Sequence, residues 1–346
     1  MNGTKMNQIL DIGGGKIESY NKALLEKKLL WSQEPFTTLE GHVQRVLPTP
    51  IIYGDKGLEL WASITHLPSY YQTRGEAALL VENSGELARW IQKDSVLIDL
   101  GCGDIRKLKP LLEELDRTQK PVLYCPLDLS RKSIERAIEQ TKLSSLPSIS
   151  VTGLWGTFED GVDWANRNCG DRPRMFLSLG SMLGNDHFED AVARLKWLCS
   201  TGLRNEYDTI LLTMDGTKDV EKICKSYDDA EGLFTQLIRQ GFEVSNDVLG
   251  DNWYRQEDWT LVRRLTQNPT MHRFVLQAKH TVPCPMRDVT LRQGDEIDCY
   301  EGFKYGPEEM AKQFEAAGIR LTSATYQYLL GNADFYSLEV QNGVTV

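Results

Sequence analysis

The sequence predicts an α/β fold with a parallel sheet and helices between its strands. Apolar runs alternate with stretches of helical periodicity from residue 96 onward. The first run ends in Asp99 and a turn with Gly101 and Gly103, and the next run ends in Asp128. Strand, glycine turn, helix, strand and acidic tip is the order in which an open α/β sheet binds a nucleoside.

Each element follows from its local pattern. Residues 107–115 carry leucines at helical spacing, and residues 187–199 carry a similar apolar stripe. The expected strands before the C-terminal part are 96–100, 122–129, 149–154, 175–179 and 209–214, and a helix is expected over 131–140. A helix over 308–317 and strands over 320–329 and 335–340 would complete a seven-stranded sheet.

Two stretches break this repeat. Residues 17–95 look helical and aromatic-rich, and residues 217–302 contain a helix over 220–240, a strand over 272–279 and a polar loop over 283–295. We therefore expect a Rossmann-like domain of residues 80–215 and 303–346. A substrate-binding lid domain would consist of residues 1–79 and 216–302.

A similar acid-glycine string, Asp11 to Gly15, lies near the N-terminus. Little apolar chain precedes it, and no second strand ending in an acid follows at the right distance. We expect a flexible N-terminal segment there.

Composition excludes several classes of partner. The chain has 346 residues, 41% hydrophobic and 25% charged, as in a globular protein. Its net charge of -10, without a basic run, argues against nucleic-acid substrates. The absence of an apolar run near 18 residues or of a signal pattern argues against a membrane span and secretion. The seven scattered cysteines indicate reduced thiols in the cytoplasm, and no His or Cys pair has metal-ligand spacing.

The glycine turn favours one nucleoside over another. A dinucleotide site needs a third glycine where the helix begins, and that position is Arg106. No phosphate-binding Gly-Lys-Ser/Thr loop is present. Two glycines and a ribose-binding acid without a phosphate seat favour S-adenosylmethionine, with a dehydrogenase and a chance strand-turn as the alternatives.

Four strings of residues then carry a resemblance to a known family. They are Tyr70-Tyr71-Gln72-Thr73-Arg74, Gly156-Thr157-Phe158-Glu159-Asp160-Gly161, Leu179-Gly180-Ser181-Met182-Leu183-Gly184-Asn185 and Tyr227-Asp228-Asp229-Ala230-Glu231-Gly232. In this order the chain resembles the amino-acid Nα-methyltransferases that include the histidine enzymes of ergothioneine synthesis. The second string is more similar to the fungal branch, which methylates 4-dimethylallyltryptophan in ergot-alkaloid synthesis. The resemblance implies a class I S-adenosylmethionine-dependent methyltransferase.

The resemblance also implies roles at the cofactor. Gly101 and Gly103 would contact the methionyl part, Lys107 its carboxylate and Asp128 the ribose hydroxyls, with Gly180 nearby. Thr157 and Phe158 occupy positions where the family has an acid and a phenylalanine beside the adenine. The neutral Thr157 is a departure that would hold the adenine amino group less strongly. A solvated helix lysine and a core phenylalanine are the structural alternatives for Lys107 and Phe158.

On the substrate side, Asn185 and Tyr227 match residues that hold an amino-acid carboxylate. Tyr53 and Tyr70 match tyrosines at the amine, where they would act in catalysis. Asn185 has a local alternative as the cap of the helix that begins near residue 187. The tyrosines have the alternative of being lid core.

One departure bears on the substrate. The histidine enzymes bind imidazole with a Glu and a Ser two residues later, shortly before a Lys-Phe pair. Aligned on Lys304, these positions are Tyr300 and Gly302, so the imidazole acceptor is lost and room is gained beside an aromatic wall. A one-residue shift of this alignment would return Glu301 to that role.

These observations predict Nα-methylation of an aromatic amino acid, tryptophan-like and in some cases prenylated, in secondary metabolism. The substrate would be a small amino-acid-like molecule, with neither nucleic acid nor membrane involved. O-methylation of a phenol or carboxylate, histidine methylation, and a non-catalytic regulatory protein are the alternatives.

Overall fold

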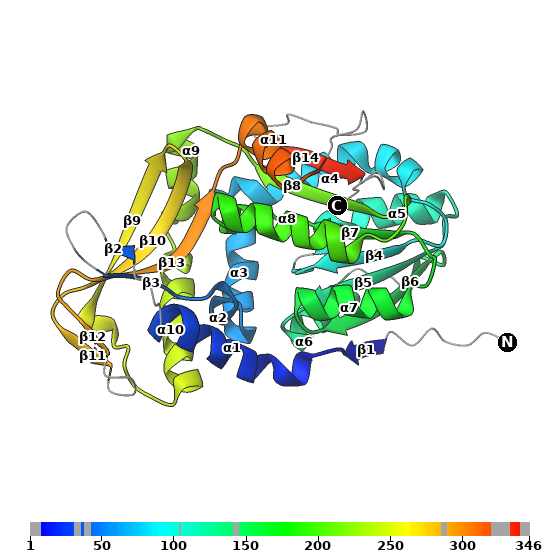
Figure 1. Ribbon diagram of the computed structural model, residues 1–346. Helices are drawn as coiled ribbons and strands as arrows, with labels where there is room; N and C mark the ends of the chain where they lie inside the picture. Colours follow the sequence, from blue (N-terminus) through cyan, green and yellow to red (C-terminus); the bar gives the residue numbers. More distant parts are fainter. Residues whose placement is uncertain are drawn as a thin grey trace. The chain divides into compact units, whose positions relative to one another are not determined.

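The computed structural model describes residues 8–30, 36–37, 43–103, 105–140, 145–284, 289–319 and 333–339. The chain divides into two compact units (Figure 1). The first unit comprises Met1–Gly14, Tyr71–Thr217 and Lys304–Val346, and the second comprises Gly15–Tyr70 and Lys218–Phe303.

The first unit contains a seven-stranded sheet with the order β1-β6-β5-β4-β7-β8-β14. Neighbouring strands from β1 to β8 are parallel, and β14 runs antiparallel to β8. The strands are β1 (Gln8–Asp11), β4 (Val96–Leu100), β5 (Val122–Asp128), β6 (Ile149–Trp155), β7 (Arg174–Ser178), β8 (Thr209–Asp215) and β14 (Ala333–Glu339). This confirms the predicted Rossmann-like sheet. The strand order reverses between β4 and β7, the switch point at which such sheets bind ligands.

The helices of this unit lie on the two faces of the sheet. They are α4 (Tyr71–Trp90), α5 (Lys109–Arg117), α6 (Arg131–Gln140), α7 (Phe158–Asn168), α8 (Phe188–Gly202) and α11 (Pro307–Ala316), with short η3 (Ile105–Lys107) and η5 (Met182–Asn185). Right-handed crossovers place α5 and α6 on one face and α7 and α8 on the other. Helix α4 packs against α5, and α8 packs against both α7 and α11 (Figure 1).

The N-terminal segment differs from its prediction. Residues Gln8–Asp11 form β1, which pairs in parallel with β6 from Thr152 to Trp155. The glycines that follow pack tightly, since a side chain on Gly14 would overlap the ring of Trp155. The expectation of a flexible segment was therefore wrong for these residues. The strand predicted over 320–329 lies outside the described residues.

The second unit combines helices with a five-stranded sheet of order β2-β3-β13-β10-β9. Its strands are β2 (Phe36–Thr37), β3 (Val43–Val46), β9 (Trp259–Gln267), β10 (Thr270–Ala278) and β13 (Glu296–Phe303). Its helical segments are α1 (Ile17–Leu25), α2 (Thr49–Ile52), α3 (Asp55–His66), α9 (Val220–Tyr227) and α10 (Leu233–Leu249), with short η1 (Gly14–Lys16), η2 (Glu26–Leu30) and η6 (Gln256–Asp258). The single helix expected over 220–240 is thus two helices. The expected loop over 283–295 contains parts of a small hairpin, β11 (Val282–Cys284) and β12 (Val289–Leu291).

A β-bulge sets which side chains share a face of this second sheet. Phe274 of β10 opposes Tyr300 of β13, but the next residue, Val275, opposes Asp298. Cys299 is therefore the extra residue of β13, and such an insertion reverses the alternation of the side chains that follow it. Tyr300 consequently faces the same side as Phe274.

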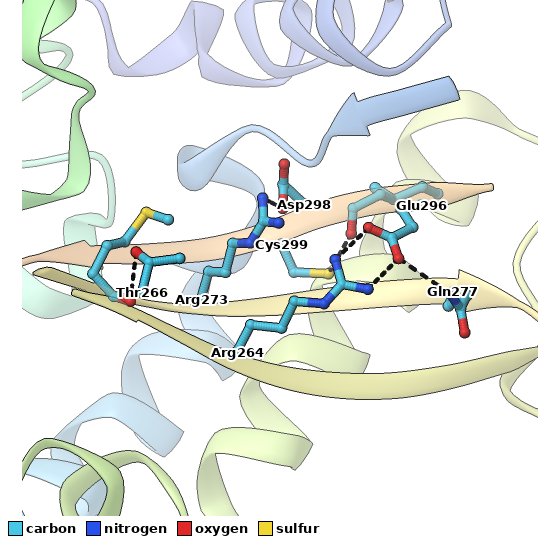
Figure 2. A network of polar contacts seen from close by, with 9 residues as sticks. Arg264, Thr266, Arg273, Gln277, Glu296, Asp298 and Cys299 are labelled. Atoms are coloured by element: carbon cyan, nitrogen blue, oxygen red, sulfur yellow. Dashed lines mark hydrogen bonds and ion pairs between the residues drawn. The ribbon is translucent and has the colours of Figure 1, made fainter. Parts of the chain in front are cut away.

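The opposite face carries a polar network (Figure 2). The guanidinium of Arg264 donates to both carboxylate oxygens of Glu296, and the Gln277 amide donates to one of them at 3.1 Å. Arg273 pairs with Asp298 at 3.3 Å. Burial raises the pKa of Glu296, but its hydrogen bonds and ion pair with Arg264 outweigh burial and hold that pKa below its usual value. These contacts join three strands across the sheet.

Candidate functional site

The glycine turn follows β4 at the switch point of the first sheet. Gly101 (φ +67°) and Gly103 (φ +45°) have left-handed backbone conformations that strain any side chain. The Gly101 amide donates to the Leu127 carbonyl at 3.0 Å. A Cβ on Gly101 would lie 3.1 Å from Sδ of Met182 and 3.6 Å from Cζ of Phe158. Two glycines thus keep backbone accessible next to an aromatic ring.

Asp128 ends β5, the strand beside β4, and is 8% exposed. Burial raises the pKa of its carboxyl to about 6, although the backbone amides of Ser130 and Gly103 and the Ser133 hydroxyl donate to it and lower the pKa. The Ser130 amide lies 3.0 Å from Oδ1. These partners are all hydrogen-bond donors, which favour the ionised form of Asp128, so the carboxyl is anionic above about pH 6. Such a carboxylate can accept further hydrogen bonds from ribose hydroxyls.

Asp99 lies on the neighbouring strand β4 and differs from Asp128 in its hydrogen-bond partner. The hydroxyl of Tyr124 donates to its carboxylate at 2.7 Å within the sheet core. Burial raises its pKa to about 6 as well, despite that hydrogen bond. The Asp99 carboxylate is therefore a buried structural group that is hydrogen-bonded within the protein core.

Thr157 begins α7 as its N-cap. Its hydroxyl accepts from the Asp160 amide at 3.2 Å, and its own backbone amide donates to the Asp160 carboxylate at 2.9 Å, so that the two residues form a capping box. The structure therefore gives Thr157 a helix-capping role that the sequence analysis did not consider. Phe158, the first helical residue, is half-buried with its ring beside Gly101. The glycine turn and the predicted adenine residue are thus neighbours.

Lys107 is not a solvated helix lysine. Its ammonium lies 2.8 Å from Oε2 of Glu76 on α4, and the two side chains are 13% and 6% exposed. Oε1 of Glu76 accepts from the Gly180 amide at 2.5 Å and from the Thr213 hydroxyl. Gly180 (φ +79°) lies so close that a Cβ there would be 3.2 Å from Nζ of Lys107.

Sequence reasoning missed Glu76. It follows Arg74 by two residues and stands two positions beyond the first of the four strings, so its place next to that string was the available signal. Nothing in the local pattern distinguishes it from the other glutamates of α4, because its partners come from η3, β8 and the turn after β7.

Asn185 ends η5 and is half-buried in the first unit. The N-cap of α8 is His187, so the alternative of Asn185 as that cap was wrong. Its side-chain amide makes no hydrogen bond with the residues that the structure describes. That leaves both donor and acceptor available to a ligand.

The four predicted tyrosines gather in the core of the second unit. Tyr70, Tyr227 and Tyr300 are 5%, 2% and 8% exposed, and Tyr53 packs against the same core. Trp61 and Phe234 link them, with ring centroids 5.5 Å apart for Trp61–Tyr70 and 5.1 Å for Tyr227–Phe234. Their rings are therefore core, while their roles toward a substrate stay a prediction.

Tyr53 packs against the same core as Tyr300. Burial raises the pKa of Tyr53 well above its usual value, and the neighbouring Tyr300 raises it further. Tyr53 is thus a neutral phenol that can orient a group by hydrogen bonding and is no base at ordinary pH.

Gly302 lies directly against the side chain of Tyr227. A Cβ on Gly302 would lie 2.6 Å from the Tyr227 hydroxyl, so glycine is what admits that hydroxyl to the surface of β13. The expectation that Gly302 leaves open room was therefore wrong in detail, because Tyr227 fills the space. The Tyr227 ring stacks on His272 at 4.3 Å between centroids.

Glu301 faces away from this cluster. It opposes Arg273 in the sheet, whereas its neighbours Tyr300 and Gly302 oppose Phe274 and His272. Adjacent residues of a strand point to opposite faces. The face that carries Tyr300 and Gly302 therefore has no carboxylate from Glu301.

In the part of the chain that the structure describes, no group of three or more His, Cys, Asp and Glu side chains is arranged to hold a metal ion. Among the same residues, no helix has the length and apolar character needed to cross a membrane.

The Rossmann-like sheet, the glycine turn at its switch point and the buried acid Asp128 at the end of the next strand are the features of a class I S-adenosylmethionine-dependent methyltransferase. The model of the family described as "Histidine-specific methyltransferase, SAM-dependent" matches residues 33–328, and the chain belongs to that family. The resemblance carried by the four strings is thereby confirmed, and S-adenosylmethionine is the methyl donor.

Three named relatives show the range of the family. "Ergothioneine biosynthesis protein 1" of Neurospora crassa is 31% identical over 281 residues, which are 81% of this chain and 32% of that protein. "N-methyltransferase imqF" of Aspergillus flavus is 27% identical over 80% of this chain and 76% of its own. "4-dimethylallyltryptophan N-methyltransferase easF" of Claviceps purpurea is 26% identical over 80% and 85%. The chain thus spans about a third of the Neurospora relative and most of the other two.

Proposed function

We propose that this protein methylates the α-amine of an aromatic, tryptophan-like amino acid. The observation that carries the proposal is the face of β13 shared by Tyr300 and Gly302, from which Glu301 is turned away. A site for imidazole needs an acceptor for its N–H group, and a buried site built around such a hydrogen bond discriminates strongly against ligands that lack it. Here aromatic rings stand in that place, which favours an apolar aromatic side chain over histidine.

The proposed donor site lies in the first unit. Gly101 and Gly103 would let backbone approach the methionyl part, Asp128 would accept from the ribose hydroxyls, and Phe158 would pack on the adenine. Lys107 and Gly180 would receive the methionine end. When bound, S-adenosylmethionine supplies a methyl group on a sulfonium, which an amine lone pair can displace in line.

The proposed acceptor residues do little acid-base chemistry. The amine has to be neutral, and a nearby sulfonium disfavours its ammonium form by like-charge repulsion. Tyr53 and Tyr70 would orient the amine as neutral hydrogen-bonding groups, with Asn185 and Tyr227 on the substrate carboxylate. Most of the rate would then come from holding the amine collinear with the methyl–sulfur bond.

The substrate would be a small molecule. The name of the Claviceps purpurea relative likewise specifies a small molecule, 4-dimethylallyltryptophan. We propose the cytoplasm as the compartment of the reaction, because the seven cysteines are odd in number and scattered along the chain, a pattern typical of reduced thiols.

A labelled-methyl assay tests the proposal. The full-length protein is incubated with labelled S-adenosylmethionine and a panel of histidine, tryptophan, tyrosine, prenylated tryptophan and phenolic metabolites, and products are assigned by mass spectrometry. We expect label on the α-nitrogen of a tryptophan-like acceptor. Label on histidine, or on an oxygen of a phenol or carboxylate, would contradict the proposal.

Two variants then test the carboxylate contacts. Asn185→Ala and Tyr227→Phe should raise KM for the amino acid while leaving S-adenosylhomocysteine affinity unchanged. Wild-type kcat/KM in both variants would remove these residues from the site.

A further inference from the structure

We propose that Glu76 is a cofactor-binding residue that receives the α-ammonium of S-adenosylmethionine, while Lys107 receives the carboxylate. The two side chains would form one site for a zwitterion, built in advance as an ion pair. This inference rests on the proposed position of the methionine end.

The location of the pair supports the inference. Lys107 ends η3, directly after the glycine turn of β4, and Gly180 follows β7, the neighbour of β4 on the other side of the switch point. Gly180 and Lys107 nearly touch, since a Cβ on Gly180 would lie 3.2 Å from Nζ. Asp128 ends β5, on the opposite side of β4. A ligand whose ribose is held by Asp128 therefore meets Lys107 and Glu76 with the end that extends toward β7.

The hydrogen bonds of Glu76 leave capacity for one more donor. A carboxylate offers about four acceptor positions on its two oxygens. Among the described residues three donors fill them, namely Lys107 on Oε2 and the Gly180 amide and Thr213 hydroxyl on Oε1. The Gly180 and Thr213 bonds fix Glu76 without neutralising its charge, because both donors are uncharged.

Charge balance explains why both residues are needed. Glu76 and Lys107 are 6% and 13% exposed, and a buried ion pair of this kind adds little net stability. A ligand carboxylate that binds Lys107 draws its positive charge away from Glu76 and would leave a buried anion undercompensated. The ammonium on the same carbon of the ligand supplies that missing charge. The pair is thus complementary to a zwitterion and a poor match for an anion alone.

Calorimetry with four ligands tests this assignment on the full chain. The ligands are S-adenosylhomocysteine, its analogue without the amino group, its analogue without the carboxylate, and methylthioadenosine, which lacks both. The variants are Glu76→Gln, which keeps the size and one oxygen of the side chain, and Lys107→Met. Glu82→Gln, an exposed glutamate of the same helix, is the matched control.

We expect Glu76→Gln to weaken S-adenosylhomocysteine and the carboxylate-free analogue about 10- to 100-fold, as for a lost hydrogen bond between charged groups. The same variant should leave the amino-free analogue and methylthioadenosine within about threefold, again on the scale of lost hydrogen bonds. Lys107→Met should show the reverse preference between the two analogues. If Glu76→Gln weakens the amino-free analogue as much as S-adenosylhomocysteine, Glu76 merely positions Lys107 and the proposal is overturned.

The wild-type protein provides a test that does not depend on any variant folding. It should bind the amino-free analogue at least about tenfold more weakly than S-adenosylhomocysteine. Equal affinity would overturn the role of Glu76 and leave the proposed function standing. Failure to bind any of the four ligands would overturn the proposed donor site together with it.

Discussion

The ammonium of Lys304 lies 2.9 Å from the carboxylate of Asp215, and the two side chains are 2% and 3% exposed. The same carboxylate accepts from the Tyr71 hydroxyl at 2.5 Å and from the Thr217 amide at 3.2 Å. Tyr71, Thr217 and Lys304 are the residues at which the segments of the first unit begin or end. The buried side chain of Asp215 therefore contacts all three of these segment ends.

Asp215→Asn should consequently destabilise the protein markedly. The amide keeps one oxygen acceptor but leaves the buried Lys304 ammonium without its counter-charge, which typically costs about 3–5 kcal/mol. Thermal unfolding followed by circular dichroism measures the loss. The exposed pair Lys225–Glu221 serves as the control, and Glu221→Gln should leave stability close to that of the wild type, because solvent screens an exposed pair.

A double variant separates charge from packing. Asp215→Asn combined with Lys304→Met removes both charges and should recover part of the lost stability. If the double variant is as unstable as the sum of the single variants, the buried charge is not the cause.

Asp128 gives the stability of the ligand-free protein a specific pH dependence. Its pKa is raised from 3.8 to about 6 on folding, so the folded state holds the proton more tightly than the unfolded chain. The stabilisation is therefore fully present below pH 3.8 and is lost as pH rises through about 6. Denaturant unfolding of wild type minus Asp128→Asn should show a difference that falls by about 3 kcal/mol over this window, since one pKa unit is worth about 1.4 kcal/mol.

The same carboxylate should make cofactor binding depend on pH in the opposite sense. Ribose hydroxyls donate to the ionised form, so S-adenosylhomocysteine affinity of the wild type should rise as pH increases through about 6. Asp128→Asn should bind weakly at every pH. An equally steep profile in that variant would assign the titration to another group, with Asp99 the first candidate because its pKa is also about 6.

Gly302 should be intolerant of any side chain. Gly302→Ala places a Cβ 2.6 Å from the Tyr227 hydroxyl, so that ring has to move. We expect a large loss of kcat/KM for the amino-acid substrate and unchanged S-adenosylhomocysteine affinity. Steady-state kinetics and calorimetry measure the two quantities.

The matched variant tests the contact itself. Gly302→Ala in a Tyr227→Phe background no longer meets a hydroxyl, so it should cost less stability than in the wild-type background. Equal costs in both backgrounds would show that the clash lies elsewhere.

Local sequence predicted where the residues of the proposed donor site lie in the fold, because the signals for these positions are local. Gly101, Gly103 and Asp128 follow directly from strands whose apolar runs are continuous, and the structure places them on adjacent strands. The charged groups around them could not be predicted in this way. Glu76 meets Thr213 across 137 positions of sequence and Lys304 meets Asp215 across 89, so neither pair leaves a local pattern.

The acceptor half shows a different limit. The sequence predicted the strand over 272–279. The faces of the sheet on which Tyr300 and Glu301 lie depend on the bulge at Cys299 in β13, and the alternation of polar and apolar residues does not reveal that bulge. Only the pairing of β13 with β10 decides which face each side chain occupies. The sequence therefore left open which of Tyr300 and Glu301 shares a face with Gly302, and the register shows that it is Tyr300.

Strand β1 was missed for a related reason, and it yields the last prediction. Its four residues make a weak apolar signal, and its partner β6 lies more than 140 positions away. A side chain on Gly14 would overlap the Trp155 ring, whereas one on Gly75 in α4 would meet nothing within 4 Å. Gly14→Ala should therefore lower stability by about 1–3 kcal/mol through overpacking. Gly75→Ala should raise it by about 0.5–1 kcal/mol, because alanine favours a helix over glycine. Thermal unfolding measures both, and a Gly14→Ala protein as stable as the wild type would mean that the N-terminal segment does not pack on Trp155 in solution.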